Sequence, residues 1–506
     1  MNKDIHERDT FSSELKRLGP TFVEIGHFLG SRPDQILEPY RNILLMLKCE
    51  CTTIEPQVVS AVLEGNLDAQ QLRMFQSFDV APIARNTWTQ DHVAEIDGGR
   101  RVRVRLVRPD AAEIIENDLK HEKLVEEILE TTGALRFGIA RHCVHEIRSW
   151  LFRQIDMEVS LRNLTRLYEC ERGEGGTRMP RPYPNLSGKA VLTMEYLEGY
   201  GLDEVIDSTD EKSISIRESV NCSQIARNVI IETLTQVLQF RFFQGNLCLS
   251  NLIAYGKESI TYRDFGYCSG IDELEAHEAL DCIEAIYKGE EKRLTHALLN
   301  LFSPNGKRDR LQNELISAIR EVLRTPVDRD ALRLGGVPVI LLMNTVLQTV
   351  LRLNIKPSLQ AVILFRTVMQ AETVARCVWR ELDSQKLVDE TATSIQLAWA
   401  LEGFRLPGIQ KTFIGLLRLL RAGPQELHHI LSQLSEGILE INVTTSEEER
   451  TSRAWQDRTR LLVAAIVSVG LAFLLGLQMP VIARWAVAVA LVLLYLWIAI
   501  RWKMLK

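Results

Sequence analysis

Hydrophobic positions recur at helical spacing through the first part of the chain. Over residues 10–80 the pattern predicts helices, and Pro20 and Pro33 interrupt it. The apolar positions that set this spacing are Leu15, Leu18, Phe22, Ile25, Phe28 and Leu29.

Residues 87–107 change to the period of two that is typical of strands. Thr87–Asp97 and Arg101–Val107 flank the turn residues Gly98 and Gly99, which predicts a hairpin. The second strand alternates strictly between apolar residues and arginines. One face therefore carries Val102, Val104 and Leu106, and the other carries Arg101, Arg103 and Arg105.

Beyond the hairpin the pattern predicts a mostly helical chain. The expected elements are a helical stretch over Ala111–Arg172, a Gly/Pro/Arg-rich loop over Glu171–Pro184, a buried strand over Ala190–Tyr196, helix over 215–243, a hairpin of Leu252–Tyr255 with Ser259–Tyr262, and helices from Glu273 to about Leu439. The broad apolar faces of Val337–Trp379 suit the core of this helical part, with a surface facing lipid or a partner as the alternative. A small strand-containing lobe before a larger helical lobe indicates an α+β fold.

Two apolar runs stand near the C-terminus, Leu461–Leu477 and Val481–Ile500, and only Arg484 interrupts the second. Each has close to the roughly 20 residues that a helix needs to cross a bilayer. Basic residues flank both outer ends of the pair: Arg458, Arg460, Arg501, Lys503 and Lys506. This predicts a transmembrane helical hairpin with both outer ends in the cytoplasm. The alternative is a buried soluble hairpin, which normally shows a polar stripe.

Composition narrows the function classes. The 506 residues suffice for two or three domains, and 46% hydrophobic with 25% charged residues describes a globular protein. A net charge of −6 gives no support for nucleic-acid binding. The nine cysteines form no C-x-x-C pair, so we expect them to be reduced. The polar segment Met1–Arg17 lacks the apolar region of a secretory signal.

The most informative motif is Asp264-Phe265-Gly266, which follows Asn251 by thirteen residues. Kinase-like proteins use an Asp and an Asn at this spacing to hold Mg²⁺ against the phosphates of ATP. Asn251 and Asp264 are therefore the candidate metal ligands. The alternative is a β-hairpin with an aspartate at a turn.

Five segments follow one another in the order of a known family. They are Leu18–Asp34, similar to a KxGQ signature; Val102–Asp110, similar to VAVKVQRPG; Gln154–Asn163, at the place of ExDFxxEAxN; Val191–Tyr196, like a hinge strand; and Gln244–Leu252, at the place of HxDPHPGNLL. The chain resembles the UbiB/AarF (ADCK-like) family of atypical kinase-like proteins, as a degenerate member. The resemblance covers roughly residues 15–385 and the C-terminal apolar tail.

The resemblance implies a protein-kinase-like two-lobe fold linked to ubiquinone and isoprenoid-lipid metabolism. It implies ATP and Mg²⁺ as cofactors, isoprenoid-quinone intermediates, membrane lipid and membrane-associated proteins as partners, and a bacterial inner-membrane location. The expected domains are an N-terminal extension at 1–80, an N-lobe with inserted helices at 81–200, a helical C-lobe at 201–440, a linker at 441–460 and two transmembrane helices at 461–500.

The N-terminal signature is altered. Glu24 stands at the position of its lysine and His27 at that of its glutamine, whereas Gly26 matches. In the family this segment covers the nucleotide site. The alternative for Glu24 and His27 is a polar helix face.

The predicted nucleotide site is also altered. Arg105 replaces the lysine of the nucleotide-binding strand, and Arg103 replaces a small alanine. Two guanidiniums on one strand face would narrow the space for adenine. Glu195, after the apolar core of the hinge strand, is a further candidate nucleotide contact. The alternative is an arginine-rich face exposed to solvent.

The helix that normally supplies the glutamate partner of the lysine carries Ser160 instead, so that ion pair is absent from its usual place. Gln154 and Asp156 stand at the positions of an acidic pair, and Asn163 matches the family. Asn246 replaces the aspartate of the catalytic loop, and an amide has no carboxylate to accept a proton.

These substitutions predict weak or absent ATP hydrolysis, as in a membrane-anchored pseudokinase. Two alternatives stay open. One is an active atypical ATPase or small-molecule kinase in which Arg105 holds phosphates and Asp156 or Asp264 assists. The other is a structural subunit of a membrane protein complex.

Overall fold

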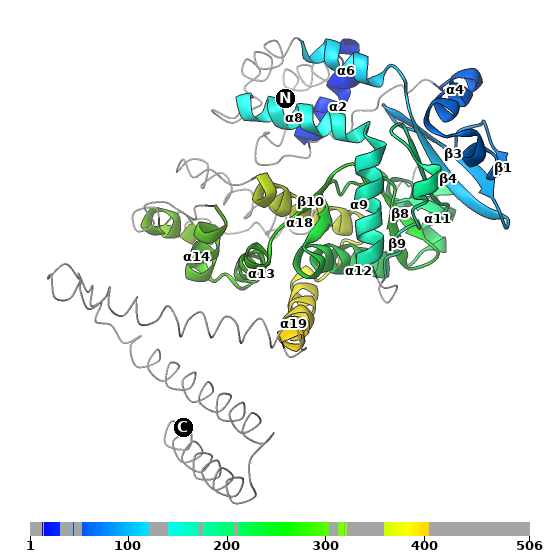
Figure 1. The fold of residues 1–506 in the computed structure, drawn as a ribbon. Coiled ribbons are helices and arrows are strands. Elements are labelled where there is room, and N and C mark those ends of the chain that lie inside the picture. The colour runs from blue at the N-terminus through cyan, green and yellow to red at the C-terminus, as the bar shows by residue number, and fades with distance from the viewer. Residues whose placement is uncertain are drawn as a thin grey trace, which may run out of the picture. The chain divides into compact units, whose positions relative to one another are not determined.

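The structure is a computed structural model that describes residues 13, 15–30, 44, 53–120, 140–171, 176–206, 211–302, 312–317, 319–320 and 359–403. These residues all belong to one compact unit, Met1–Phe404 (Figure 1). The predicted linker at 441–460 and the predicted transmembrane hairpin at 461–500 lie outside the described residues. Among the helices that are described, none is long and apolar enough to cross a membrane.

An antiparallel sheet forms the smaller lobe. Its strands are β1 (Phe75–Phe78), β2 (Ala84–Arg85), β3 (Thr89–Ile96), β4 (Arg100–Val107) and β5 (Val191–Glu195). They lie in the order β1-β3-β4-β5, and β2 pairs with β3. The predicted hairpin and hinge strand are thus confirmed. The prediction of helices over 10–80 is wrong at β1, because its two phenylalanines pack with the sheet's core.

The two faces of β4 differ as the alternation predicts. Val102, Val104 and Leu106 are 0% exposed and pack in a small core with helix α4 (Pro56–Asn66). The short helix α5 (Ala69–Leu72) contacts α4 and η1 (Pro184–Leu186), and η1 contacts β5. The other face of β4 carries Arg101, Arg103 and Arg105, and Arg105 contacts Asp264 of the larger lobe.

Four more helices are α2 (Pro20–Gly30), α6 (Ala111–Leu119), α8 (Ala140–Gln154) and α9 (Met157–Cys170). Helix α2 contacts α6 and α8, and α9 packs on β5. The predicted helical stretch from 111 to 172 is therefore interrupted, and the break between α8 and α9 falls at Asp156, the N-cap of α9.

Helices and two small ribbons make up the larger lobe. The helices are α10 (Leu202–Ile206), α11 (Glu211–Ser219), α12 (Cys222–Leu234), α13 (Glu273–Lys288), α14 (Glu291–Phe302), α18 (Leu359–Val378) and α19 (Ser384–Gly403). In the first ribbon β8 (Leu252–Tyr255) pairs with β6 (Gly199–Gly201) on one side and with β9 (Ser259–Tyr262) on the other. In the second, β7 (Phe242–Gln244) pairs with β10 (Cys268–Gly270). The short 3₁₀ helix η3 (Leu249–Asn251) precedes β8. The hairpin predicted at 252–262 is confirmed.

The helix predicted over 215–243 ends early. After α12 the chain continues as a π-helical segment, η2 (Thr235–Phe240), and stops at Arg241, whose φ of 55° is left-handed. Strand β7 follows at once and pairs with β10. The apolar run Phe242-Phe243 thus belongs to a buried strand, which periodicity alone does not distinguish from helix.

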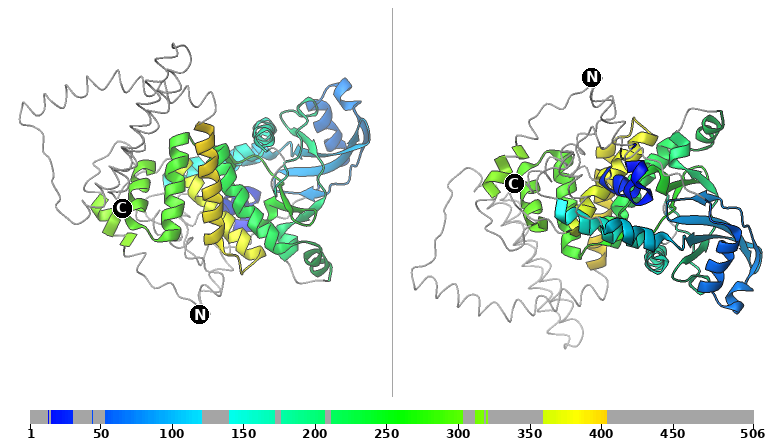
Figure 2. Two further views of the ribbon diagram at one scale, coloured as in Figure 1. Left: turned by 90° about the horizontal axis from the view of Figure 1, so that it is seen from below. Right: turned by 90° about the horizontal axis from the view of Figure 1, so that it is seen from above.

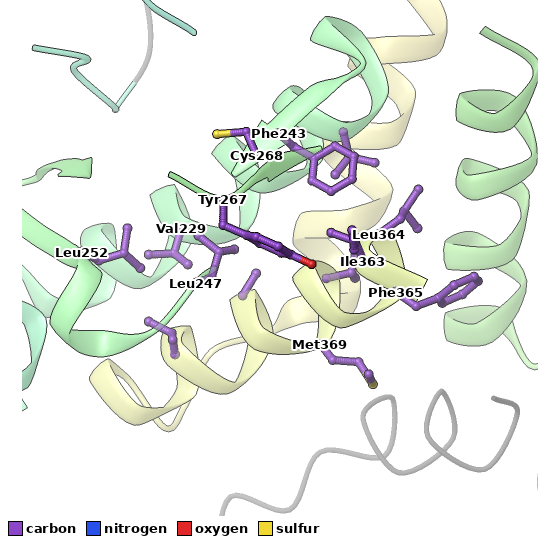
Figure 3. Close-up of a cluster of buried hydrophobic side chains, with 14 of the residues drawn as sticks. Val229, Phe243, Leu247, Leu252, Tyr267, Cys268, Ile363, Leu364, Phe365 and Met369 are labelled. Carbon is purple, nitrogen blue, oxygen red and sulfur yellow. The ribbon is translucent and has the colours of Figure 1, made fainter. Parts of the chain in front are cut away.

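Helix α18 forms the centre of the larger lobe, lying along α12 (Figure 2). Figure 3 shows Tyr267 above α18, close to Ile363 and Leu364, with Phe243 and Leu247 in the same cluster. The expectation that the apolar faces of 337–379 form core is confirmed for α18, the part of that segment that is described. The two loops that carry Asn246 and Asp264 are therefore anchored on one apolar cluster.

Candidate functional site

Arg105 and Asp91 form a buried ion pair between neighbouring strands. Asp91 on β3 is the register partner of Arg105 on β4. Arg105 Nε donates to Asp91 Oδ1 at 2.7 Å, and Nη2 donates to Oδ2 at 2.9 Å. The two side chains are 2% and 1% exposed. The carboxylate that neutralises the strand cation thus comes from the adjacent strand, whereas the family takes it from a helix.

Arg105 also reaches the larger lobe. Its Nη1 donates to Asp264 Oδ1 at 3.2 Å, and Asp264 is 25% exposed. One guanidinium therefore joins two carboxylates, and it holds the sheet to the loop that carries the DFG motif. A phosphate that enters this site would compete with both carboxylates for the same cation.

Arg103 shares the face of β4 with Arg105. It is 11% exposed, its Nη1 lies 4.0 Å from Asp91 Oδ2, and its guanidinium carbon lies 5.8 Å from the centre of the Tyr196 ring. Arg101 stacks on the same ring at 4.5 Å. The alternative of a solvent-exposed arginine face is wrong at 103 and 105. Arg103 and Tyr196 lie together at the end of the hinge strand, beside the expected adenine position.

Burial and charge oppose each other in this group. Burial raises the pKa of the Asp91 carboxyl. The charge and hydrogen bonds of Arg105, and the charges of Arg103 and Arg263, lower the same pKa by more, so it lies below its ordinary value. Burial lowers the pKa of Arg103, and the charges of Arg105 and Arg263 add to that effect. Asp91 is therefore a carboxylate throughout the physiological range, and the arginines around it repel one another.

The structure brings the predicted metal ligands together. Asn251 Oδ1 accepts from the backbone N–H of Asp264 at 2.6 Å, and Asn251 Nδ2 donates to the carbonyl of Asn246 at 2.8 Å. Gln244 donates to the carbonyl of Asp264. These bonds fix the catalytic-like loop against the DFG loop. The Asn246 amide lies beside them, with no carboxylate to serve as a base at that position.

This donor set is a poor fit to Mg²⁺. The ion favours several oxygen ligands in octahedral geometry, including free carboxylate oxygens. Here one oxygen of Asp264 is bonded to Arg105, and the oxygen of Asn251 is bonded to a backbone N–H. No group of three or more His, Cys, Asp or Glu side chains that would hold a metal occurs in the part of the chain that the structure describes.

The helix α9 motif positions the DFG loop and supplies no counter-ion to Arg105. Asn163 Nδ2 donates to the carbonyl of Phe265 at 2.8 Å. Asp156 caps α9, accepting from the N–H of Val159 at 2.9 Å. Ser160 is 1% exposed, and its hydroxyl has no hydrogen-bond partner among the described residues. Ser160 therefore provides no counter-ion for Arg105.

The end of α8 approaches the DFG glycine. A Cβ placed on Gly266 would lie 3.0 Å from the carbonyl oxygen of Arg153 and 3.5 Å from the Cα of Gln154. The Nε2 of Gln154 is buried and has no hydrogen-bond partner within the described ranges. Gln154 therefore contributes close backbone packing against Gly266.

The N-terminal segment reaches the loop before β3. Glu24 on α2 is 9% exposed and accepts from the Thr87 hydroxyl. His27 Nδ1 lies 3.8 Å from Glu24 Oε1, and Gly26 lies between them in the same helix. The alternative of a merely polar helix face is wrong for Glu24, which is buried against the loop that precedes the Asp91 strand.

Glu195 contacts the segment that follows residue 175. Its carboxylate accepts from Arg178 Nη2 at 2.5 Å and from the N–H of Arg181 at 3.2 Å. The Glu195 N–H donates to the Arg181 carbonyl at 2.8 Å. This carboxylate is therefore engaged by its own chain, and its predicted contact with a nucleotide would require it to leave these partners.

Comparison with known families bears on this geometry. The sequence model described as ABC1 atypical kinase-like domain matches residues 46–298, half of the chain. The chain belongs to the UbiB/AarF family of ABC1 atypical kinase-like proteins. This UbiB/AarF member keeps the kinase-like fold, the loops that carry Asn246 and Asp264, and a cation on β4. The counter-ion of that cation is Asp91 on β3 instead of a glutamate on α9.

The chain is also similar to individual proteins of this family. "Protein ACTIVITY OF BC1 COMPLEX KINASE 7, chloroplastic" of Arabidopsis thaliana is 27% identical over 285 residues, 56% of this chain but only 40% of the relative's length. "Probable protein kinase UbiB" of Azotobacter vinelandii is 24% identical over 473 residues, 92% of this chain and 83% of the relative. A solved structure of a Mycobacterium tuberculosis protein in complex with erythromycin is 16% identical with a TM-score of 0.44, covering 67% of this chain and 83% of the other.

Sequence reasoning missed three residues of the site: Asp91, Arg263 and Arg366. Asp91 had a usable signal, because antiparallel pairing across Gly98-Gly99 places it opposite Arg105. Arg263 is adjacent to the DFG motif in sequence. Arg366 lies on α18, and its Nη2 donates to the Gly245 carbonyl at 2.5 Å. No local sequence pattern predicts that contact.

Proposed function

We propose that this UbiB/AarF member is a membrane-anchored pseudokinase or weak ATPase that supports ubiquinone or other isoprenoid-lipid metabolism. The observation that carries the proposal is the double engagement of Arg105 by Asp91 and Asp264. The phosphate-binding cation is already neutralised by protein carboxylates. The carboxylate expected to hold the metal is one of them.

Catalysis of phosphoryl transfer depends on positioning the phosphates and on stabilising their charge. Arg105 and Asp264 are bonded to each other and are less available for either role. Asn246 leaves the catalytic loop without a general base, and such bases typically contribute about 10²–10⁴ in rate. Arg103 and Tyr196 lie beside the expected adenine position. Weak ATP and Mg²⁺ binding, with little or no hydrolysis, is the expected behaviour.

ATP turnover tests the chemical part of this proposal. Purified full-length protein in detergent or nanodiscs is assayed for phosphate release with ATP and Mg²⁺, beside the variant Asp264→Ala. We expect rates at background level for both proteins. Robust Mg²⁺-dependent turnover that Asp264→Ala abolishes would show an active atypical ATPase instead.

Nucleotide binding tests the role of Arg103. We expect ADP and ATP to bind weakly with Mg²⁺. Arg103→Ala should bind adenosine, which carries no phosphate, more tightly than the unaltered protein does, because the substitution opens space beside Tyr196. A matched control is Arg101→Ala, which removes the other arginine on this ring but is 48% exposed. Tight Mg²⁺-dependent binding by the unaltered protein would contradict a narrowed site.

The cellular part of the proposal rests on the relatives named UbiB and on the apolar runs at 461–500. The protein would be held in a bacterial inner membrane with the described unit in the cytoplasm. It would act on, or beside, enzymes that handle isoprenoid-quinone intermediates. Deletion of the gene, with quinones quantified by mass spectrometry, tests this role. Unchanged quinone levels would favour a structural subunit of a membrane complex.

A further inference from the structure

Two arginines in the site, Arg103 and Arg263, are poorly supplied with hydrogen-bond acceptors among the described residues. Arg103 extends from β4 in the smaller lobe, and Arg263 directly precedes Asp264 in the larger lobe. The Nε atoms of both are buried without a partner in the described part of the chain. A guanidinium has five N–H donors and cannot shed its charge, so burial without acceptors is costly.

The nearby carboxylates do not satisfy these cations. Asp91 gives both of its oxygens to Arg105 and lies 4.0 Å from Arg103. Asp264 gives one oxygen to Arg105. We call Arg103, Arg105, Arg263, Asp91 and Asp264 the charged cluster; it has three positive and two negative groups, and so one net positive charge.

Two acidic residues near Arg263, Asp203 and Glu204, do not pair with it either. A Cβ on Gly201 would lie 3.2 Å from Arg263 Nη2, 3.2 Å from Glu204 Oε1 and closer still to Asp203 Oδ1. Within the described ranges, neither Asp203 nor Glu204 forms an ion pair with Arg263. Both are exposed, so water screens their charge.

Solvent reaches the charged cluster, because Asp264 is 25% exposed and Arg103 is 11% exposed. A tetrahedral anion that bridges the two lobes there would accept from Arg103 on one side and Arg263 on the other. Arginine forks match phosphate oxygens in pairs, and such charge-assisted bonds are stronger than neutral ones. The same anion would offset the mutual repulsion of the three arginines.

We propose that the charged cluster is a metal-independent receptor for a diphosphate group, in which Arg103 and Arg263 take the role that Mg²⁺ has in a kinase. This deepens the proposed function, since it names the ligand class of the same site. It explains why Arg103 and Arg263 stand beside Arg105 although Asp91 and Asp264 do not satisfy their hydrogen-bond donors. The ligand class is a diphosphate, borne by a nucleotide, by a lipid precursor or by the free ion.

Titration calorimetry in EDTA tests the proposal with three probes: inorganic pyrophosphate, ADP and dimethylallyl diphosphate. We expect pyrophosphate to bind without metal, and Arg103→Gln and Arg263→Gln each to weaken it about tenfold, because each removes a charge-assisted bond. Arg241→Gln is the control, because its guanidinium pairs with Glu273 at 3.1 Å, outside the charged cluster. It is expected to bind as the unaltered protein does.

Arg263→Lys keeps the positive charge and is expected to retain part of the affinity for pyrophosphate. This variant separates the loss of charge in Arg263→Gln from a loss of folding. Tighter binding of dimethylallyl diphosphate than of ADP would identify a lipid precursor as the source, and the reverse order would identify a nucleotide. Pyrophosphate binding that needs Mg²⁺, or that survives both glutamine variants unchanged, would overturn the proposal. ATP turnover is a separate readout, so the receptor stands even if hydrolysis is found.

Discussion

Asp91 accepts two hydrogen bonds from Arg105 across the β3–β4 ladder, at 2.7 and 2.9 Å, while Asp264 accepts a third from the same guanidinium at 3.2 Å. The counter-ion of the strand cation thus comes from the neighbouring strand, and the helix position that would supply it carries Ser160. A carboxylate on a neighbouring strand is fixed by the sheet itself. The pair is therefore set by strand register and does not depend on how α9 is placed.

Asp91→Asn is expected to lower the free energy of unfolding by about 3 to 5 kcal/mol. The substitution leaves Arg105 buried without a charged partner, and breaking a buried pair from one side has this cost. Chemical denaturation followed by circular dichroism measures it. Asp97→Asn, at the exposed turn of the same hairpin, is the control and should change stability little. A loss below 1 kcal/mol for Asp91→Asn would mean that Asp264 alone can neutralise Arg105.

Ser160→Glu, which places a glutamate where the family has one, should destabilise the folded protein. Ser160 is 1% exposed, and Arg105 already has its carboxylates, so Ser160→Glu would bury a charge without a partner. We expect a loss of about 3 kcal/mol or more in the free energy of unfolding. Ser160→Ala is the matched control and should be nearly neutral, because the hydroxyl bonds nothing among the described residues.

The double variant Asp91→Asn/Ser160→Glu tests whether a glutamate at 160 can replace Asp91. If the double variant is more stable than Asp91→Asn alone, the new glutamate has reached Arg105, and the two positions act as alternative counter-ion sites. Additive losses are the expected result, because the bidentate geometry with β3 is set by the strand pairing. Thermal melts of the four proteins of this cycle are enough to decide between the two outcomes.

The sequence predicts much of this fold because its strands alternate cleanly and its motifs occur in family order. The β3–β4 hairpin, the β8–β9 hairpin and the arginine face of β4 all follow from local periodicity. Strand β1 and the end of the helix before β7 do not, because short apolar runs suit either helix or buried strand. The partners of the site are harder still: Arg366 reaches Gly245 across 121 positions, and only the tertiary packing reveals it.

Asp156 should prove structural. Because its side chain caps α9, Asp156→Ala is expected to cost about 1 kcal/mol of stability and to leave nucleotide and pyrophosphate binding unchanged. Asp156→Ser keeps a capping oxygen and should retain most of the stability. Loss of ligand binding in both variants, with folding intact, would instead place Asp156 in the site's chemistry.

Two glutamates, the partly buried Glu171 and the buried Glu232, should make the protein less stable as the pH rises. Burial raises the pKa of Glu171 to about 7, and the neighbouring charge of Glu232 adds to the rise, although the Met179 N–H and the charge of Arg178 oppose it. Burial also raises the pKa of Glu232, whose carboxylate accepts from Gln236 at 2.8 Å. Each group is held in an environment that favours its neutral form.

The sign follows from linkage. A carboxyl whose folded pKa lies above its unfolded value contributes stability that is fully present below the unfolded value, and loses it as the pH rises through the folded one. For Glu171 that window runs from its ordinary pKa of 4.5 to about 7. The unaltered protein should therefore become less stable between these two pH values and level off above them.

Glu171→Gln should remove much of this dependence, because the amide keeps an oxygen to accept from Met179 and carries no charge at any pH. We expect the variant to match the unaltered protein near pH 4.5 and to exceed its stability at pH 8. Denaturation midpoints at four pH values across this range measure the difference. Glu169→Gln, exposed on the same helix, should follow the unaltered protein throughout. Parallel curves for Glu171→Gln and the unaltered protein would show that Glu171 is charged at low cost in the folded state.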